Sequence, residues 1–201
     1  MNFFELKENL LSLGYSVKEF DTKNDASDYL CDVIVNKSVG IGGSVTVEEM
    51  NLIKSLSLKN KVITHIGISD KNEQDILRKK ASNTDIYISS VNAISINGEI
   101  INIDNTGNRV ANILYGHEKV YLIVGENKIE NDYESALYRA RNVAAPLNSR
   151  RLNKKTPCAI KGDKCYNCKC DDRICRVFSV LWEAPLGCSY EIILIHEKLG
   201  Y

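Results

Sequence analysis

The chain has 201 residues, a length typical of one domain. Hydrophobic residues make up 44% and charged residues 26% of the sequence, a balance that excludes a wholly disordered chain. Lys+Arg and Asp+Glu are equal at 26 each, and the resulting zero net charge argues against a nucleic-acid-binding protein and against electrostatic attachment to anionic membranes.

The sequence shows neither a membrane-spanning segment nor a signal peptide, and both observations bear on cellular location. No apolar run approaches the roughly 20 residues that a membrane-spanning helix needs. The first residues, Met-Asn-Phe-Phe-Glu-Leu-Lys, contain no basic segment followed by an apolar one, so no signal peptide is predicted. We therefore expect a cytoplasmic protein whose thiols stay reduced.

Helices and strands are predicted to alternate along most of the chain. The spacing of Phe3, Leu6, Leu10 and Leu13 is typical of one face of a helix. An Asn97-Gly98 pair predicts a hairpin within 91–103. Helices are expected over 2–13, 25–35, 47–56, 70–81 and 133–144, and strands over 15–20, 38–43, 61–66, 85–89, 119–124 and 191–197. This alternation predicts an α/β protein with a largely parallel sheet.

Residues 145–190 depart from this alternation. They have weak periodicity, contain two of the three prolines in their first half and hold most of the cysteines. We interpret 1–201 as a single α/β domain in which 145–190 is an irregular, Cys-rich, metal-binding excursion. The apolar residues around Trp182 are expected to pack this excursion against the domain.

A glycine-rich loop lies between the strand at 38–43 and the following helix. Gly42, Gly43, Ser44 and Thr46 are candidate ligand-binding residues, because α/β sheets bind ligands at the carboxyl ends of strands and glycines let the backbone approach an anion. The alternative is purely local, since Thr46 and Glu49 have the spacing of a capping box. Glu49 is thus a candidate catalytic residue or only a cap.

A second polar segment surrounds the predicted hairpin. Asn92, Asn108 and Arg109 are candidate ligand-binding residues, because amides and a guanidinium bind polar anions. Glu99 and Asp104 are the candidate acids or bases. The alternative is turn chemistry, which the same residue types favour. His65, His117 and His196 are each expected to be structural or exposed, with His117 the best placed of the three.

The cysteines are the most informative feature, because five of the seven lie between 158 and 175. Cys165 and Cys168 form a Cys-x2-Cys pair, with Cys158 and Cys175 placed symmetrically outside it. Four thiolates would complete a zinc site or hold an iron–sulfur cluster, and the spacing leaves the two open. Cys170 is a spare ligand or replaces one of the four. The alternative is a group of ordinary reduced cysteines, as we expect Cys31 and Cys188 to be.

Three segments together resemble the LUD domain family, named for lactate utilization. They are Gly42-Gly43-Ser44-x-Thr46-x-x-Glu49, Asn92-Ala93-Ile94 with Asn97-Gly98, and Arg139-x-Arg141-x-x-Ala144-Ala145-Pro146-x-Asn148. The tail from Thr156 to Cys175 resembles a cysteine-bearing short branch of that family. The resemblance implies a fold similar to the NagB/RpiA/CoA-transferase group, with helices on both faces of the sheet, and a site at the glycine loop and Asn92.

Three functions follow as hypotheses. The first is a LUD-type protein of lactate or organic-acid metabolism that binds a small anionic metabolite at the glycine loop and a metal or iron–sulfur cluster at the cysteines. The second is an enzyme acting on a sugar phosphate or CoA ester through Glu49, Glu99 or Asp104. The third is a non-enzymatic, metal-stabilised subunit that docks an iron–sulfur oxidoreductase.

Overall fold

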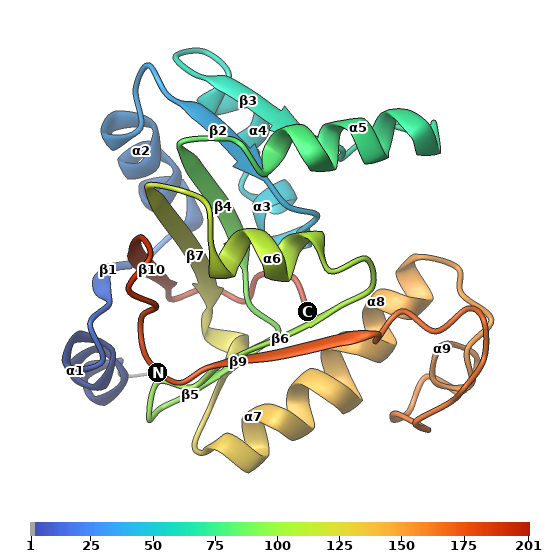
Figure 1. The fold of residues 1–201 in the computed structure, drawn as a ribbon. Coiled ribbons are helices and arrows are strands. Elements are labelled where there is room, and N and C mark those ends of the chain that lie inside the picture. Colours follow the sequence, from blue (N-terminus) through green and yellow to red (C-terminus); the bar gives the residue numbers. More distant parts are fainter. Residues whose placement is uncertain (1–2) are drawn as a thin grey trace.

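The computed structural model describes residues 3–201 and contains a six-stranded sheet in the order β1-β10-β7-β4-β2-β3 (Figure 1). Every neighbouring pair in this sheet is parallel. The strands are β1 (Ser16–Phe20), β2 (Ser38–Ile41), β3 (Lys61–Thr64), β4 (Ile86–Ser90), β7 (Lys119–Gly125) and β10 (Ser189–Ile195). The expected α/β class and parallel sheet are confirmed.

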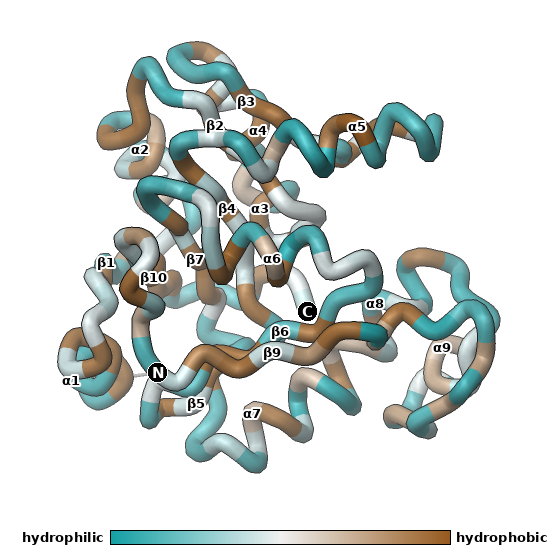
Figure 2. The backbone as a smooth tube through the Cα atoms, viewed as in Figure 1, coloured by the Kyte–Doolittle hydropathy of each residue, from teal (hydrophilic) through white to brown (hydrophobic). Residues whose placement is uncertain are grey.

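Helices cover both faces of the main sheet, because its central strands are apolar on both sides. In β7, Val120, Leu122 and Val124 face one hydrophobic core, whereas Tyr121 and Ile123 face another. The helices α1 (Phe4–Ser12) and α6 (Asn108–Leu114) pack in the first core, and α2 (Lys23–Val33), α3 (Val45–Glu49) and α4 (Leu52–Leu56) pack in the second. Figure 2 shows the contrast between the hydrophobic strands and the largely hydrophilic α5 (Lys71–Ala81) near the sheet edge.

A second, smaller sheet has the order β8-β5-β6-β9. Its strands are β5 (Ala93–Ser95), β6 (Ile100–Asp104), β8 (Ile129–Glu130) and β9 (Val177–Leu181). The predicted hairpin is β5 and β6, which pair antiparallel. The helix α7 (Tyr133–Arg139) packs its Ala136 against Ala93 and Ile101 of this sheet. The second sheet thus brings β9, from late in the chain, beside the hairpin.

Two stretches differ from the predicted pattern of elements. The helix expected over 47–56 is interrupted, because Asn51 adopts a left-handed conformation with φ of 53° between α3 and α4. The stretch 145–190, predicted as an irregular excursion, contains short regular elements between irregular segments. The helix of α7 continues through a π-helical turn (Ala140–Ala144) into α8 (Ala145–Arg151), and both α9 (Pro157–Lys161) and β9 lie within the range. Pro146 stands at the start of α8, directly after this π-helical turn, and the helix continues past it.

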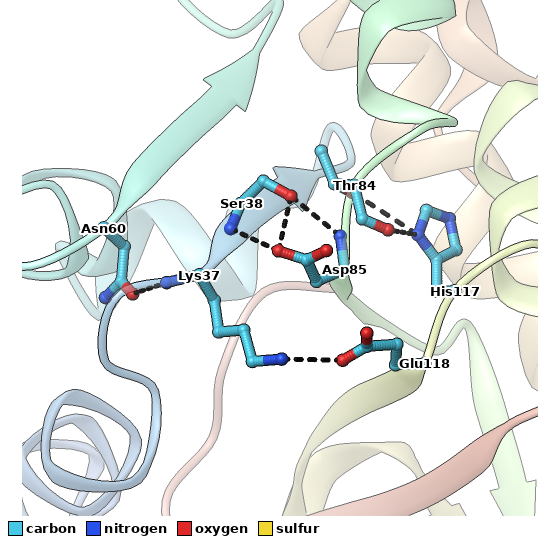
Figure 3. A network of polar contacts seen from close by, with 7 residues as sticks. All are labelled: Lys37, Ser38, Asn60, Thr84, Asp85, His117 and Glu118. Carbon is cyan, nitrogen blue, oxygen red and sulfur yellow. Dashed lines mark hydrogen bonds and ion pairs between the residues drawn. The ribbon is translucent and has the colours of Figure 1, made fainter.

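A polar network joins the amino ends of β2, β4 and β7 (Figure 3). Asp85 accepts hydrogen bonds from the backbone N–H and the hydroxyl of Ser38, each at 2.8 Å, and these bonds lower the pKa of the carboxyl. His117 is buried, and its Nδ1 lies 2.7 Å from the Thr84 carbonyl oxygen. Because the strands are parallel, this network is at the opposite end of the sheet from the glycine loop. His117 is therefore not at the predicted ligand edge.

No helix between residues 3 and 201 is both long and apolar enough to cross a membrane.

Replacement of Gly40 by alanine is expected to destabilise the fold. A Cβ atom there would lie 2.7 Å from both the Ala81 carbonyl oxygen and Thr84 Oγ1, inside a buried strand. Overpacking of this kind costs about 1–3 kcal/mol. Urea unfolding of Gly40→Ala measures the loss. Gly43→Ala is the matched control, because its Cβ would meet nothing closer than His65 Nε2 at 3.5 Å; equal stability of the two variants would contradict the prediction.

Candidate functional site

Two adjoining cavities lie at the carboxyl ends of the main-sheet strands, where α/β proteins commonly bind ligands. One has a volume of about 190 Å³ and the other about 50 Å³. Both are lined by Gly43 after β2, Asn92 after β4, Arg109 at the start of α6, and Asn148 and Arg151 of α8. The glycine loop, the Asn-rich segment and the motif around Asn148 therefore meet at one place, which we call the loop cavity.

Most of the predicted ligand-binding residues line the loop cavity. Gly43, Asn92, Asn108 and Arg109 line its larger part, and Ser44 and Thr46 line its smaller part. Gly42 lines neither part. Its N–H donates to the Ile88 carbonyl oxygen, and a Cβ atom there would collide with the Tyr87 hydroxyl. The sequence signal at Gly42 therefore reflects close packing of the loop on β4.

Arg109 has a guanidinium group that bonds to neutral oxygens. Its Nη2 donates to the Ile103 carbonyl oxygen at 2.6 Å, and its Nη1 donates to the Asn102 side-chain oxygen at 3.1 Å. Within residues 3–201, no carboxylate forms an ion pair with it. These bonds hold the guanidinium in place without neutralising its charge.

Asp104 lines the larger part of the cavity but has its oxygens engaged. Oδ1 accepts from the N–H of Asn105, and Oδ2 accepts from the N–H groups of Arg109 and Val110. This predicted acid or base therefore also fixes the first turn of α6, a helix that sequence periodicity did not predict.

Two residues that were not candidates also line the cavity, His65 after β3 and Arg78 of α5. Burial and the positive charge of Arg78 lower the pKa of His65, and the negative charge of Asp104 opposes that shift. Arg78 Nε is buried without a hydrogen-bond partner among the described residues. Isolated His and Arg residues give no sequence signal, because only the fold of β3 and α5 brings them here.

The other two candidate acids lie elsewhere. Glu99 accepts a hydrogen bond from the Ser95 hydroxyl in the hairpin turn and does not line the cavity. Glu49 Oε2 accepts from the N–H of Gly200 at 2.9 Å. The capping box predicted for Thr46 and Glu49 is wrong, since Ser44 caps α3 by accepting from the N–H of Val47. Thr46 lies two residues after this cap, within the first turn of the helix, and its side chain is engaged with Lys128.

Lys128 is the functional candidate that sequence reasoning missed. It ends a short 3-10 turn (Glu126–Lys128) after β7, lines the smaller part of the cavity and is only 3% exposed. Its Nζ lies 2.7 Å from both Thr46 Oγ1 and Ser90 Oγ. Burial and the nearby Arg139 and Arg109 lower the pKa of Lys128 to about 7. A lone Lys in a polar turn reads as a surface residue, so the sequence contained no signal for it.

The four cysteines predicted as ligands line one small cavity, which we call the thiol cavity. Cys158, Cys165, Cys168 and Cys175 all border it, and Cys170 does not. Its volume is about 10 Å³. Arg173 crosses the same segment and donates to the carbonyl oxygens of Cys168 and Cys175.

Cys170 instead lies against Cys168, with 3.4 Å between the two Sγ atoms, and this hydrogen bond raises the pKa of the Cys170 thiol. Within residues 3–201, no three His, Cys, Asp or Glu side chains are close enough together to hold a metal ion. The donor chemistry of the thiol cavity suits a thiophilic metal, although its thiols are not grouped closely enough to bind one as they lie.

Comparison with known proteins gives a family. The model of the LUD domain matches residues 4–195, nearly the whole chain. The chain belongs to the LUD domain family. Among solved structures, this LUD domain protein is similar to a DUF162 family protein from Deinococcus radiodurans, with a TM-score of 0.56 and 10% identity over 96% of this chain and 94% of that one. That similarity shows a shared fold.

A ribose 5-phosphate isomerase from Plasmodium falciparum aligns with a TM-score of 0.34 and 22% identity over 54% of this chain and 52% of the isomerase. No curated protein matches the chain. The resemblance noticed in the glycine loop, the Asn92 segment and the Cys-rich tail is confirmed at the level of the family. Membership supports a role related to lactate utilization.

Proposed function

We propose that this LUD domain protein binds a small organic carboxylate in the loop cavity, as part of lactate or related organic-acid metabolism. The observation that carries the proposal is Arg109, whose guanidinium borders both parts of the cavity and bonds to neutral oxygens. A charged group held beside a cavity without a counter-ion attracts an anion.

The charges around the cavity support an anionic ligand. Arg109 and Arg151 line its larger part against one carboxylate, Asp104. A third arginine there, Arg78, is paired with Asp75. The Asp104 carboxylate already accepts three backbone N–H groups, which offset its negative charge. Arg151 bonds through Nε and Nη2 to the Asn148 side-chain oxygen, another neutral partner. The cavity is therefore positively charged overall.

The size of the cavity favours a small acid over a CoA ester. Its two parts have volumes of about 190 and 50 Å³. Pockets for drug-sized ligands are about 300–1,000 Å³. A metabolite of a few carbon atoms fits this space, which makes the hydroxy and oxo acids of lactate metabolism better candidates than a CoA ester.

Titration calorimetry with L-lactate and pyruvate tests the proposal. Arg109→Gln is expected to weaken binding by about 10–100-fold, because a hydrogen bond to a charged group contributes about 1.5–3 kcal/mol. Lactamide, which lacks the carboxylate charge, is expected not to bind. If lactamide binds as well as lactate, the cavity does not select anions.

A second test variant and a control accompany this titration. Arg151→Gln is a second test variant, because within residues 3–201 the exposed Arg151 side chain bonds only to Asn148, and its loss is expected to leave the fold intact. Arg176→Gln is the matched control, since Arg176 lies in the Cys-rich segment outside the loop cavity. Equal affinities of wild type, Arg109→Gln and Arg151→Gln would contradict the proposal.

A second proposal concerns the thiol cavity, which we infer binds a single metal ion such as zinc through Cys158, Cys165, Cys168 and Cys175. The supporting observation is that these four cysteines, at the predicted spacing, border one cavity while Cys170 stays outside it. A volume of about 10 Å³ has room for about one water-sized particle, which favours an ion over an iron–sulfur cluster. The ion would tie α9 to the segment before β9.

A further inference from the structure

Lys128 Nζ lies between two hydrogen-bond acceptors from the start of α3 and the end of β4. Both oxygens that it contacts are hydroxyls, Thr46 Oγ1 and Ser90 Oγ. Each hydroxyl already donates its own hydrogen to a backbone carbonyl, Ser90 to Ile123 at 2.6 Å and Thr46 to Leu199 at 3.3 Å. Both hydroxyls therefore present lone pairs to Lys128 and accept hydrogens from it.

The number of these acceptors matches a neutral amine. A neutral amine has two N–H groups and one lone pair, whereas an ammonium has three N–H groups. Across residues 3–201, Lys128 Nζ donates to these two hydroxyls and to no third group, and no carboxylate forms an ion pair with it. Two donated hydrogens leave the lone pair of a neutral amine unoccupied.

The charges around Lys128 also favour the neutral amine over the ammonium. Arg109 and Arg139 are the nearby cations that disfavour a charged Lys128, and Glu49 is the acid that opposes them. Glu49 is itself engaged by the N–H of Gly200. With a pKa of about 7, a large share of Lys128 is the nucleophilic free amine at neutral pH.

We propose that Lys128 forms an imine with the carbonyl carbon of a small 2-oxo carboxylate bound in the loop cavity. The inference rests on the proposed carboxylate site, because Lys128 borders the same small space as Arg109 and Arg151. These two arginines hold the carboxylate, and the neighbouring carbonyl group then lies toward the amine. Only a ligand that has both groups uses the whole site.

The reaction balances without an oxidant or a reductant. The lone pair of Nζ attacks the carbonyl carbon and forms a carbon–nitrogen bond. The two hydrogens of the amine are transferred to the carbonyl oxygen, the carbon–oxygen bond breaks, and the oxygen leaves as water. The product is a neutral imine, and its protonated form withdraws electrons from the adjacent carbons.

Reductive trapping tests the imine directly. The purified protein is incubated with pyruvate and sodium cyanoborohydride, which reduces an imine to a stable secondary amine, and the product is analysed by intact-mass and peptide mass spectrometry. We expect one reduced pyruvate adduct per chain, located on Lys128. Lys128→Arg is expected to reduce labelling at least about tenfold. Lys119→Arg, which changes a partly buried lysine paired with Glu191, is expected to label normally.

The alternative outcomes are distinct. Absence of the adduct, its spread over exposed lysines in the wild type, or undiminished single labelling in Lys128→Arg would overturn the imine. Peptide mapping of the wild type decides the site even if the variant fails to fold. L-lactate has no carbonyl carbon to form an imine, so its binding tests the carboxylate site separately. Lactate binding without a pyruvate adduct would refute the imine alone, and loss of both would refute both proposals.

Discussion

The free energy of unfolding of the wild type is expected to increase with pH relative to that of Lys128→Met. The folded-state pKa of Lys128 is about 7, below its ordinary value of 10.5. Between these two values the unfolded chain holds a proton that the folded chain has released, so raising the pH favours the folded state. The difference between the two proteins should grow by about 1.4 kcal/mol per pH unit.

Urea unfolding at about pH 7.5, 8.5 and 9.5 measures this difference, and the comparison cancels the other titrating groups that the two proteins share. Lys119→Met is the matched control. Burial lowers the pKa of Lys119, but the hydrogen bond to Glu191 and the nearby Tyr121 and Glu191 together raise it further than burial lowers it. Its contribution to stability is therefore constant below the ordinary lysine pKa and is lost only above it. Parallel stability curves for wild type and Lys128→Met would show that Lys128 stays charged in the folded protein.

The wild type, purified without oxygen, is expected to contain about one zinc ion per chain, and Cys165→Ser/Cys168→Ser is expected to contain none. The double variant removes the Cys-x2-Cys pair, half of the four thiols that border the thiol cavity. Two remaining thiolates do not complete a tetrahedral site. Elemental analysis with an acid-labile sulfide assay and a visible spectrum measures the metal content.

Cys170→Ser and Cys31→Ser are the controls for this experiment. Cys170 lies outside the thiol cavity, and Cys31 is on α2, so both variants should retain the ion. Iron and sulfide in equal amounts would contradict a single ion and indicate a cluster. A wild type without metal, with all of its thiols free, would contradict metal binding altogether.

Much of the fold could be predicted because periodicity is a local property. The strands at β7 and β10 are continuous apolar runs, as strands buried on both faces must be, and their alternation with helices indicated a parallel sheet. Local signals failed where a short element takes its stability from its neighbours. α6 begins in an Asn-rich turn that Asp104 organises, and β9 is stabilised by pairing with β6, far away in the sequence.

The residues of the loop cavity could likewise be predicted only in part from the sequence. Gly43 and Asn92 could be predicted as candidates because each follows a strand of the parallel sheet, and the carboxyl ends of parallel strands lie at one edge. Arg109 follows β6, an antiparallel strand of the second sheet, and its candidacy came from the chemistry of its side chain. The sequence could not show that Gly43 lines the cavity and Gly42 does not. The two glycines differ in their spatial neighbours, because the Tyr87 hydroxyl packs against Gly42 and leaves no room for a ligand. Nor could it separate Asp104 from Glu99, because the direction of each side chain depends on the turn that carries it.

The sequence by itself determined the α/β class, the family and the spacing of the four cysteines, because hydrophobic periodicity and motif spacing depend only on the order of residues in the chain. Only the tertiary structure decided that His65, Arg78 and Lys128 meet Arg109 around one cavity. It also decided that Lys128 is buried between two hydroxyls with no carboxylate partner in the described chain. Burial and charge are properties of the space around a residue, which segments far apart in the sequence create together, and they set the chemistry of a lysine that looks ordinary in the sequence.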